Sequence, residues 1–171
     1  NMGFHSKPTT FIGHVKIKVQ DLNRSINFYR DILGFDVLEK TSSSVKLTTD
    51  GKSSFLSLEQ PENVTPKENR ATGLYHFAIL LPDKTHLANI TIHLARNGIQ
   101  FGASDHLVSE ALYLQDPDGN EIEIYRDRKP SEWTWNGDEV AMTTKPLNFD
   151  RLLTHATEDQ PWDRMPAKTL M

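Results

Sequence analysis

Hydrophobic positions near the start of the chain change from a two-residue period to a helical period. Val15, Ile17 and Val19 alternate with polar residues, which predicts a half-buried strand. Apolar residues then recur at helical spacing from Asp21, a suitable N-cap, to Gly34, a residue suited to ending a helix. Three more strands are expected in the ranges 35–39, 44–49 and 53–59. The predicted order is strand, helix and three strands, written βαβββ.

The same order recurs in the second half of the chain. A strand is predicted at 74–81 and a helix over 83–97. Strands are then expected near 100–104, 108–115 and 120–126. Each repeat also carries an Asp-Gly pair ahead of its last strand. This self-similarity predicts an α+β fold of two βαβββ units, connected by the Pro-rich stretch 61–66.

The pattern fades after the second repeat. One domain is therefore predicted over residues 9–127, and residues 128–171 are interpreted as a tail or as a linker toward a second module. A short helix is expected around 147–156. Trp133 and Trp135 are expected to pack, either on the domain itself or against another subunit.

The composition narrows the chemistry and the partners. The chain has 171 residues, of which 37% are hydrophobic, with a net charge of −4 and no cysteine. The absence of cysteine excludes disulfides, thiolate metal sites and cysteine nucleophiles. Lys and Arg are scattered, so nucleic acid is not an expected partner. No apolar run approaches the roughly 20 residues of a membrane span, and the first residues lack a signal peptide's apolar region. A cytoplasmic protein without a membrane partner is predicted.

Three side chains with metal-binding chemistry lie on polar faces of the predicted strands. Ile122 and Ile124 point toward the helices, so Glu123 points the other way. His14 and His76 occupy the same position in the two repeats. A histidine on a strand is usually a surface residue, but this shared register favours the ligand interpretation. Two imidazoles and one carboxylate suit Fe(II), Mn(II), Zn or Ni and leave coordination positions open for substrate.

Four segments resemble the vicinal oxygen chelate superfamily, which includes glyoxalases, fosfomycin-resistance proteins, bleomycin-binding proteins and extradiol dioxygenases. They are IGHVKIKVQDL (12–22), SINFYRDILGF (25–35), YHFAI (75–79) and DPDGNEIEIY (116–125). The resemblance implies a curved, cupped mixed sheet with helices on its outer face. It also implies that the metal ligands are His14, His76 and Glu123, with Glu121 as the alternative carboxylate.

Within the superfamily, the stretch before Glu123 resembles the ring-cleaving extradiol dioxygenases. That family places a tyrosine ten residues before the ligand glutamate, where Tyr113 stands, and a histidine further upstream, where His106 stands. The segment 72–82 looks most like the first module of two-module Bacillus-type catechol 2,3-dioxygenases. The chain is then expected to be a fragment that ends about where the second module would begin.

Glyoxalase I enzymes add a second glutamate from the first repeat. The alignment of the two repeats places Phe55 at the position of Glu123, with Ser57 next on the same face. Glu59, near the end of that strand, is the only carboxylate there that could substitute. The resemblance therefore favours three protein ligands over a glyoxalase I site.

The resemblance implies extradiol cleavage of a catechol-like ring. A divalent metal, with Fe(II) favoured over Mn, Zn or Ni, would bind a small aromatic substrate and O2. His106 would act as general acid or base, and Tyr113 would hydrogen-bond a reacting oxygen. Two alternatives stay open: another metal-dependent reaction, such as isomerisation or thiol transfer, and a non-catalytic module that binds a small molecule. A homodimer is expected by analogy with the superfamily.

Overall fold

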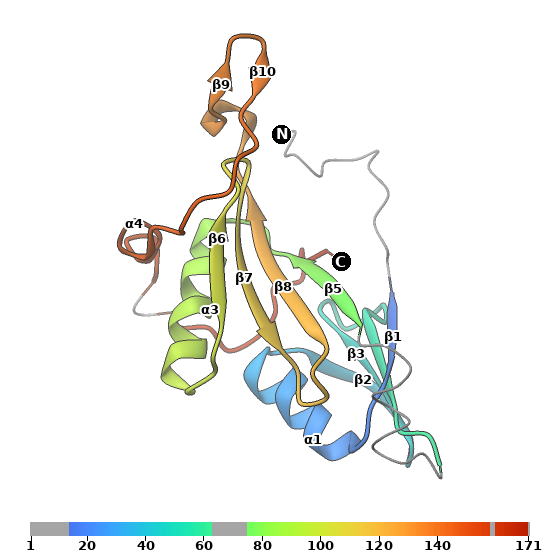
Figure 1. The fold of residues 1–171 in the computed structure, drawn as a ribbon. Helices are drawn as coiled ribbons and strands as arrows, with labels where there is room; N and C mark the ends of the chain where they lie inside the picture. The colour runs from blue at the N-terminus through green and yellow to red at the C-terminus, as the bar shows by residue number, and fades with distance from the viewer. Residues whose placement is uncertain (1–13, 63–74, 158–159, 171) are drawn as a thin grey trace.

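The computed structural model describes residues 14–62, 75–157 and 160–170, and these contain two units with the same order of elements (Figure 1). The first unit consists of β1 (Val15–Lys18), α1 (Leu22–Ile26), the π-helical segment η1 (Asn27–Ile32), β2 (Asp36–Lys40), β3 (Ser44–Thr48) and β4 (Leu56–Glu59). The second unit consists of β5 (His76–Leu80), α3 (Lys84–Arg96), β6 (Gly102–Asp105), β7 (Ser109–Gln115) and β8 (Glu121–Asp127). This order confirms the predicted βαβββ repeat. Most of the predicted connector lies outside the described residues.

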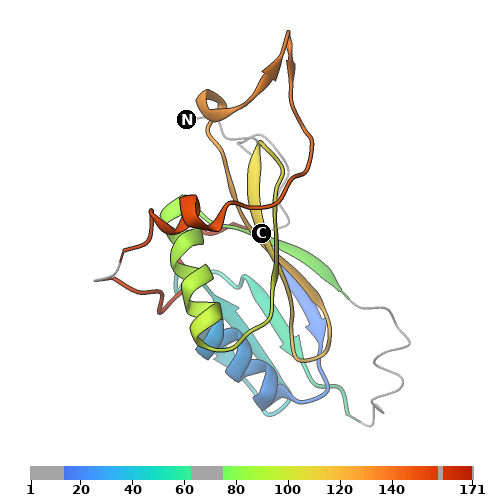
Figure 2. The ribbon, with the colours of Figure 1, turned by 60° about the vertical axis from the view of Figure 1, so that its left-hand side comes forward.

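Each unit forms a four-stranded mixed sheet, in the orders β1-β4-β3-β2 and β5-β8-β7-β6. In both sheets the first strand of the unit pairs in parallel with its last strand, and the other neighbours pair antiparallel. The expected cupped sheet therefore consists of two sheets that are hydrogen-bonded separately within the described residues. Helices α1 and α3 lie next to each other, to one side of the sheets (Figures 1 and 2). Among the described residues of the two repeats, no helix covers the other side of the sheets.

Alternation along the strands decides which face meets the helices. In β8, Ile122 and Ile124 are buried, whereas Glu121 is exposed and Glu123 is half-buried. The buried side chains join a single core with the apolar face of α3, formed by Leu87, Ala88, Ile90 and Leu94. Each fully buried aliphatic side chain contributes roughly 1.5–3 kcal/mol to folding. The polar face of β8 is thus fixed by the burial of its opposite face.

The helices begin at the predicted caps. The Asp21 carboxylate accepts the Arg24 N–H, and the Asp83 carboxylate accepts the His86 N–H. The first helix differs from its prediction, because residues 27–32 form a π-helical turn in place of a continuous α-helix, and the Leu33 N–H donates to the Phe28 carbonyl. Among the described residues, no helix is both long and apolar enough to span a bilayer.

A buried carboxylate connects the two units. Asp116, at the turn between β7 and β8, accepts the hydroxyl proton of Tyr29 from η1 at 2.8 Å and the side-chain amide of Asn120 at 2.9 Å. Its second oxygen accepts the backbone N–H groups of Asp118 and Asn120. Burial, followed by the nearby Asp116 carboxylate, raises the pKa of Tyr29, so its hydroxyl remains a donor. The start of β8 is thereby fixed against the helical segment of the first unit.

Part of the chain after β8 projects away from the sheets. It contains η2 (Pro130–Glu132), β9 (Trp135–Asn136) and β10 (Glu139–Val140), and the last two form a hairpin (Figure 1). Trp133 packs locally, because its indole N–H donates to the Arg128 carbonyl and its ring lies 6.2 Å from that of Trp135. Trp135 takes part in this ring contact but is 53% exposed.

The final segment returns to both units. It includes α4 (Phe149–Leu153), which lies in the range of the predicted short helix. Trp162 is buried and donates its indole N–H to the Leu33 carbonyl at 3.2 Å. Leu170 forms an antiparallel bridge with Leu80 of β5. This segment therefore packs on the end of the first helix and beside the first strand of the second unit.

The contact at Gly34 gives a test of this packing. Gly34 has φ +89°, and a β-carbon there would lie 2.6 Å from the Arg164 α-carbon. Gly98 ends the equivalent helix with φ +67° and has open space around it. A left-handed alanine costs about 1–2 kcal/mol at either position, and backbone displacement should add about 1–3 kcal/mol at Gly34. We expect Gly34→Ala to lower the free energy of unfolding more than Gly98→Ala in denaturant titrations. Equal losses would contradict the close packing of the final segment.

Candidate metal centre

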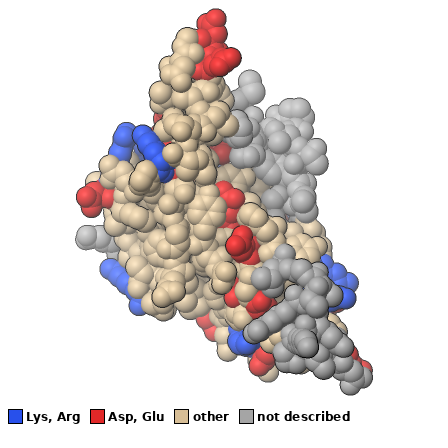
Figure 3. Space-filling view, viewed as in Figure 1, with Lys and Arg blue, Asp and Glu red and all other residues tan. Residues whose placement is uncertain are grey.

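The polar face of the second sheet brings together the chemistry predicted for the site. Parallel pairing of β5 with β8 places His76 opposite Glu121 and Ala78 opposite Glu123. Paired residues point to the same face, so His76 and both glutamates share one surface. Acidic side chains run down the middle of this side of the molecule (Figure 3). Such a surface favours the binding of a cation.

Strand pairing in the first unit corrects the alignment of the repeats. Val15 pairs with Leu56 just as Phe77 pairs with Ile122, so Ser57 is the residue equivalent to Glu123. The prediction that Phe55 holds this position is wrong. Phe55 instead lies in the core, with its ring 5.4 Å from that of Phe35. The first unit therefore has a hydroxyl where the second unit has a carboxylate.

The first unit also shows which side chains can meet across this register. His14 Nε2 lies 2.8 Å from the hydroxyl oxygen of Ser57. His76 and Glu123 occupy the equivalent positions of the second unit. His14 thus reaches the side chain of Ser57, and by the same register His76 can reach the side chain of Glu123. This geometry favours Glu123 over Glu121 as the partner of His76.

The donor set fits a divalent metal in chemistry and number. Two imidazoles and one carboxylate are ordinary ligands of Fe(II), Mn(II), Zn and Ni. Glu59, the candidate fourth ligand, forms an ion pair with Lys16 at 2.9 Å. In the described ranges, no three His, Asp or Glu side chains are already gathered as a group that could hold a metal ion. The structure brings His76 and Glu123 to one face and places His14 on the other sheet against Ser57.

Tyr113 lies beside Glu123, and His106 lies beside Tyr113. Tyr113 pairs with Glu123 across β7 and β8, and its hydroxyl oxygen is 2.6 Å from His106 Nε2. Burial and then the Glu123 carboxylate raise the pKa of Tyr113, and a hydrogen bond from Ser104 opposes this shift. The two residues suggested by the family spacing are therefore neighbours, and Tyr113 shares the face of Glu123.

Sequence reasoning missed one residue of this cluster. The hydroxyl oxygen of Thr144 lies 3.1 Å from His106 Nδ1, although the two residues are 38 positions apart in the chain. Thr144 belongs to the segment that was interpreted as a tail or linker, and no spacing rule of the repeats reaches it. Only the pairing of that segment with β6 reveals it.

Tyr125 adds to the electrostatics of the same face. It lies two residues after Glu123 along β8 and is buried. Burial raises its pKa, and the charges of Asp127 and Glu123 raise it further. The phenol therefore remains neutral at physiological pH next to a row of carboxylates.

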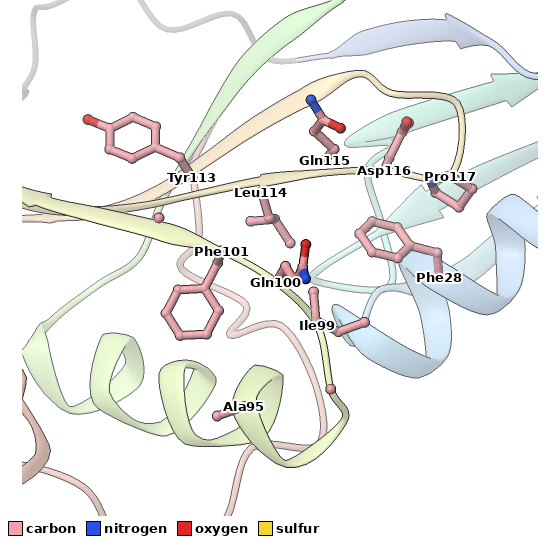
Figure 4. Close-up of a pocket in the computed structure, with 12 residues that line it drawn as sticks. Phe28, Ala95, Ile99, Gln100, Phe101, Tyr113, Leu114, Gln115, Asp116 and Pro117 are labelled. Atoms are coloured by element: carbon pink, nitrogen blue, oxygen red, sulfur yellow. The ribbon is translucent and has the colours of Figure 1, made fainter.

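A large groove lies along β7. Its volume is about 1050 Å³, and its walls come from η1, the end of α3, the approach to β6, and β7. In Figure 4, the side chains of Phe28, Ile99, Phe101 and Leu114 lie around this groove. Tyr113 also lines it, and its ring extends away from these four side chains. The groove therefore adjoins, through Tyr113, the face that carries Glu123.

Comparison with known proteins identifies the superfamily to which this chain belongs. Residues 11–124, more than half of the chain, match the family model of the Glyoxalase/Bleomycin resistance protein/Dioxygenase superfamily. The chain belongs to this superfamily, as its four motif segments indicate.

The relatives of this chain include dioxygenases and a metallothiol transferase. The chain is 46% identical to the catechol-2,3-dioxygenase of Bacillus subtilis (strain 168) over 153 residues, which cover 88% of this chain and 54% of that protein. The chain thus spans about half the length of that relative. It is 30% identical to the biphenyl-2,3-diol 1,2-dioxygenase 3 of Rhodococcus globerulus, over 84% of this chain and 80% of that protein. It is also 29% identical to the metallothiol transferase FosB of Staphylococcus epidermidis (strain ATCC 12228 / FDA PCI 1200), over 68% of this chain and 81% of that protein.

Solved structures confirm the fold class. A glyoxylase/bleomycin resistance protein/dioxygenase domain from Frankia sp. EAN1pec superposes with a TM-score of 0.57 at 22% identity, covering 70% of this chain and 98% of that domain. The lactoylglutathione lyase from Agrobacterium tumefaciens gives a TM-score of 0.56 at 22% identity, covering 70% of this chain and 95% of that one. These similarities establish the arrangement of two βαβββ units with curved mixed sheets.

The charge of Glu123 gives a test of the site's geometry. Replacing Glu123 by Gln removes the negative charge that disfavours the phenolate, so the pKa of Tyr113 should fall toward its ordinary value. Glu121→Gln is the matched control, because this charge lies on the same face opposite Gln115 and does not perturb Tyr113. NMR titration of tyrosines labelled at the carbon bearing the hydroxyl measures both. A larger fall in Glu121→Gln would contradict the placement of Glu123 beside Tyr113.

Proposed function

We propose that this domain is an extradiol ring-cleaving dioxygenase that uses Fe(II) to open a catechol-like ring with O2. The observation that carries the proposal is the row of Glu123, Tyr113 and His106 on the face that also bears His76. A ligand carboxylate next to a proton-carrying pair suits a reaction in which an aromatic diol must lose protons. The relatives named as catechol and biphenyl-diol dioxygenases support the same chemistry.

His14, His76 and Glu123 would hold the metal. When bound, Fe(II) would supply a Lewis acid with open positions for the two substrate oxygens and for O2. The Ser57 hydroxyl would help to orient the His14 ring, since outer partners of ligand imidazoles commonly fix their orientation. Because Ser57 stands at the position of Glu123 in the repeat, the first unit contributes one ligand and the second contributes two.

Tyr113 and His106 would manage protons at the substrate. The raised pKa of Tyr113 keeps its hydroxyl protonated at neutral pH, so Tyr113 acts as a hydrogen-bond donor. An imidazole takes up and releases protons readily near neutral pH, which suits His106 to act as the general acid or base. The distance of 2.6 Å between His106 Nε2 and the Tyr113 hydroxyl oxygen links the hydrogen-bond donor to the general acid or base. Removal of either side chain would therefore affect the same proton transfer.

A second candidate is a metal-dependent thiol transfer or isomerisation on the same scaffold. The similarity to metallothiol transferase FosB favours it, and it would accord with Zn, Mn or Ni in place of Fe(II). The Tyr113–His106 pair favours ring cleavage, because the extradiol family resemblance includes both residues. A non-catalytic module that binds a small molecule is the third candidate. It would need neither a metal nor this pair.

Several other properties stay predictions from the sequence. They are a small aromatic substrate, a homodimer, a cytoplasmic location, a domain over residues 9–127 and a tail or linker over 128–171. For a longer protein that contains this chain, we propose the same ring-cleaving activity.

The proposal is tested by loading the full chain with Fe(II) without oxygen and then adding air and a substrate. We expect about one iron per chain by elemental analysis and a yellow ring-cleavage product from catechol or biphenyl-2,3-diol. His76→Ala should lower iron affinity by more than about 100-fold, because even outer partners of a metal contribute 10–100-fold. It should also abolish product formation. His86→Ala is the control, since His86 contacts Asp83 at the start of α3.

Each contrary result has a distinct meaning. Iron binding without cleavage of any simple catechol would contradict ring cleavage and favour the thiol-transfer or isomerase candidate. Full iron retention in His76→Ala would contradict the ligand set. Protein that binds no divalent metal would favour the non-catalytic module.

A further inference from the structure

The segment after β10 extends the second sheet at its edge. The backbone N–H of Asp105, at the end of β6, donates to the Lys145 carbonyl at 2.8 Å, and the Lys145 N–H donates back to the Asp105 carbonyl at 2.8 Å. In an antiparallel pair, the residue after Asp105 meets the residue before Lys145. This register places Thr144 beside His106 and explains the contact of 3.1 Å between them.

The loop that carries His106 is held in a strained conformation. Leu107 has φ +67° and is the only non-glycine residue with a positive φ in the described ranges. Such a conformation is unfavourable for a residue with a side chain and persists only where the surroundings enforce it. Here the Asp105 carboxylate accepts the Leu107 N–H at 2.8 Å and two N–H groups of Arg128 at 2.6 and 2.9 Å. The same anchor therefore fixes both the loop and the strand register next to it.

The direction of each hydrogen bond follows from the groups that can donate. An ionised carboxylate only accepts, so the Tyr113 hydroxyl donates to Glu123, with which it is paired across the strands. The Tyr113 oxygen then accepts from His106 Nε2. A neutral imidazole with its proton on Nε2 has an acceptor at Nδ1. The hydroxyl of Thr144 is the donor at that atom.

We propose that Thr144 is a positioning residue that holds the His106 ring and fixes its neutral tautomer with the proton on Nε2. The inference rests on the proposed function for its catalytic consequence, but its structural part stands independently. Thr144 is exposed, whereas Tyr113 and Glu123 are half-buried. The hydrogen bonds therefore form a chain from the solvent side, through Thr144, His106 and Tyr113, to the ligand glutamate. Threonine suits the first place in this chain because a hydroxyl both donates and accepts, so the chain can reverse its direction when a proton moves.

The test compares Thr144→Val with Thr144→Ser in the full chain. Valine has nearly the same shape but no hydroxyl, whereas serine keeps the hydroxyl. Long-range ¹H–¹⁵N correlation NMR, at a pH where the imidazole is neutral, reports which ring nitrogen of His106 carries the proton. His106→Gln assigns the signals. We expect a single Nε2–H tautomer in the wild type and in Thr144→Ser, and a mixture of tautomers in Thr144→Val.

Steady-state kinetics of the iron-loaded protein give the second readout. We expect kcat of Thr144→Val to fall by about 10-fold, in the range of other outer-sphere hydrogen bonds. KM should stay nearly constant, and Thr144→Ser should restore kcat. An unchanged tautomer together with an unchanged kcat in Thr144→Val would overturn the inference. If no variant cleaves a catechol, the proposed function fails and the tautomers alone decide the role of Thr144. A mixture in Thr144→Val then supports that role, and an unchanged tautomer overturns it.

Discussion

The buried Asp116 carboxylate is the interaction on which the geometry of the site depends. It accepts the hydroxyl of Tyr29 from the first unit while it closes the turn that leads into β8. Tyr29 is fully buried, and a buried carboxylate without its donors would leave a costly unpaired charge. Asp118 of the same turn accepts N–H groups from Gln20 and Arg24. These bonds hold β8, and with it Glu123, at a fixed position against the unit that carries His14.

The repeat supplies one scaffold, and a single position gives its two halves different chemistry. His14 with Ser57, and His76 with Glu123, occupy the same register in their respective sheets. The core requires only that the neighbouring residues be apolar, so the polar position can change from serine to glutamate without disturbing the sheet. The second unit then adds Tyr113 on the next strand, and the segment after β10 adds Thr144 beside His106. The proposed site thus combines residues placed by strand pairing within the two sheets with Thr144, which the segment after β10 adds at the sheet edge.

The sequence predicted the elements and the polar faces because alternation and helical spacing report burial directly. The sequence alignment misplaced Phe55 for a physical reason: the first unit has two more residues between its Asp-Gly pair and Ser57 than the second unit has between its Asp-Gly pair and Glu123. A shift of two residues leaves the faces unchanged. Hydrophobic alternation cannot detect such a shift. Tyr113 and His106 were suggested by family spacing, whereas Thr144 depends on strand addition from a distant segment. The buried contact of Trp162 with Leu33 is likewise long-range, so no local sequence pattern predicts it.

The central claim is that one metal ion joins ligands from both repeats. A crystal structure of the anaerobic, iron-loaded protein, with anomalous data collected on both sides of the iron absorption edge, tests it most directly. We expect one iron peak within about 2.0–2.2 Å of a nitrogen of His14, a nitrogen of His76 and an oxygen of Glu123, the range of metal–nitrogen and metal–oxygen bonds. An iron held by Glu121 in place of Glu123, or one that His14 does not contact, would contradict it.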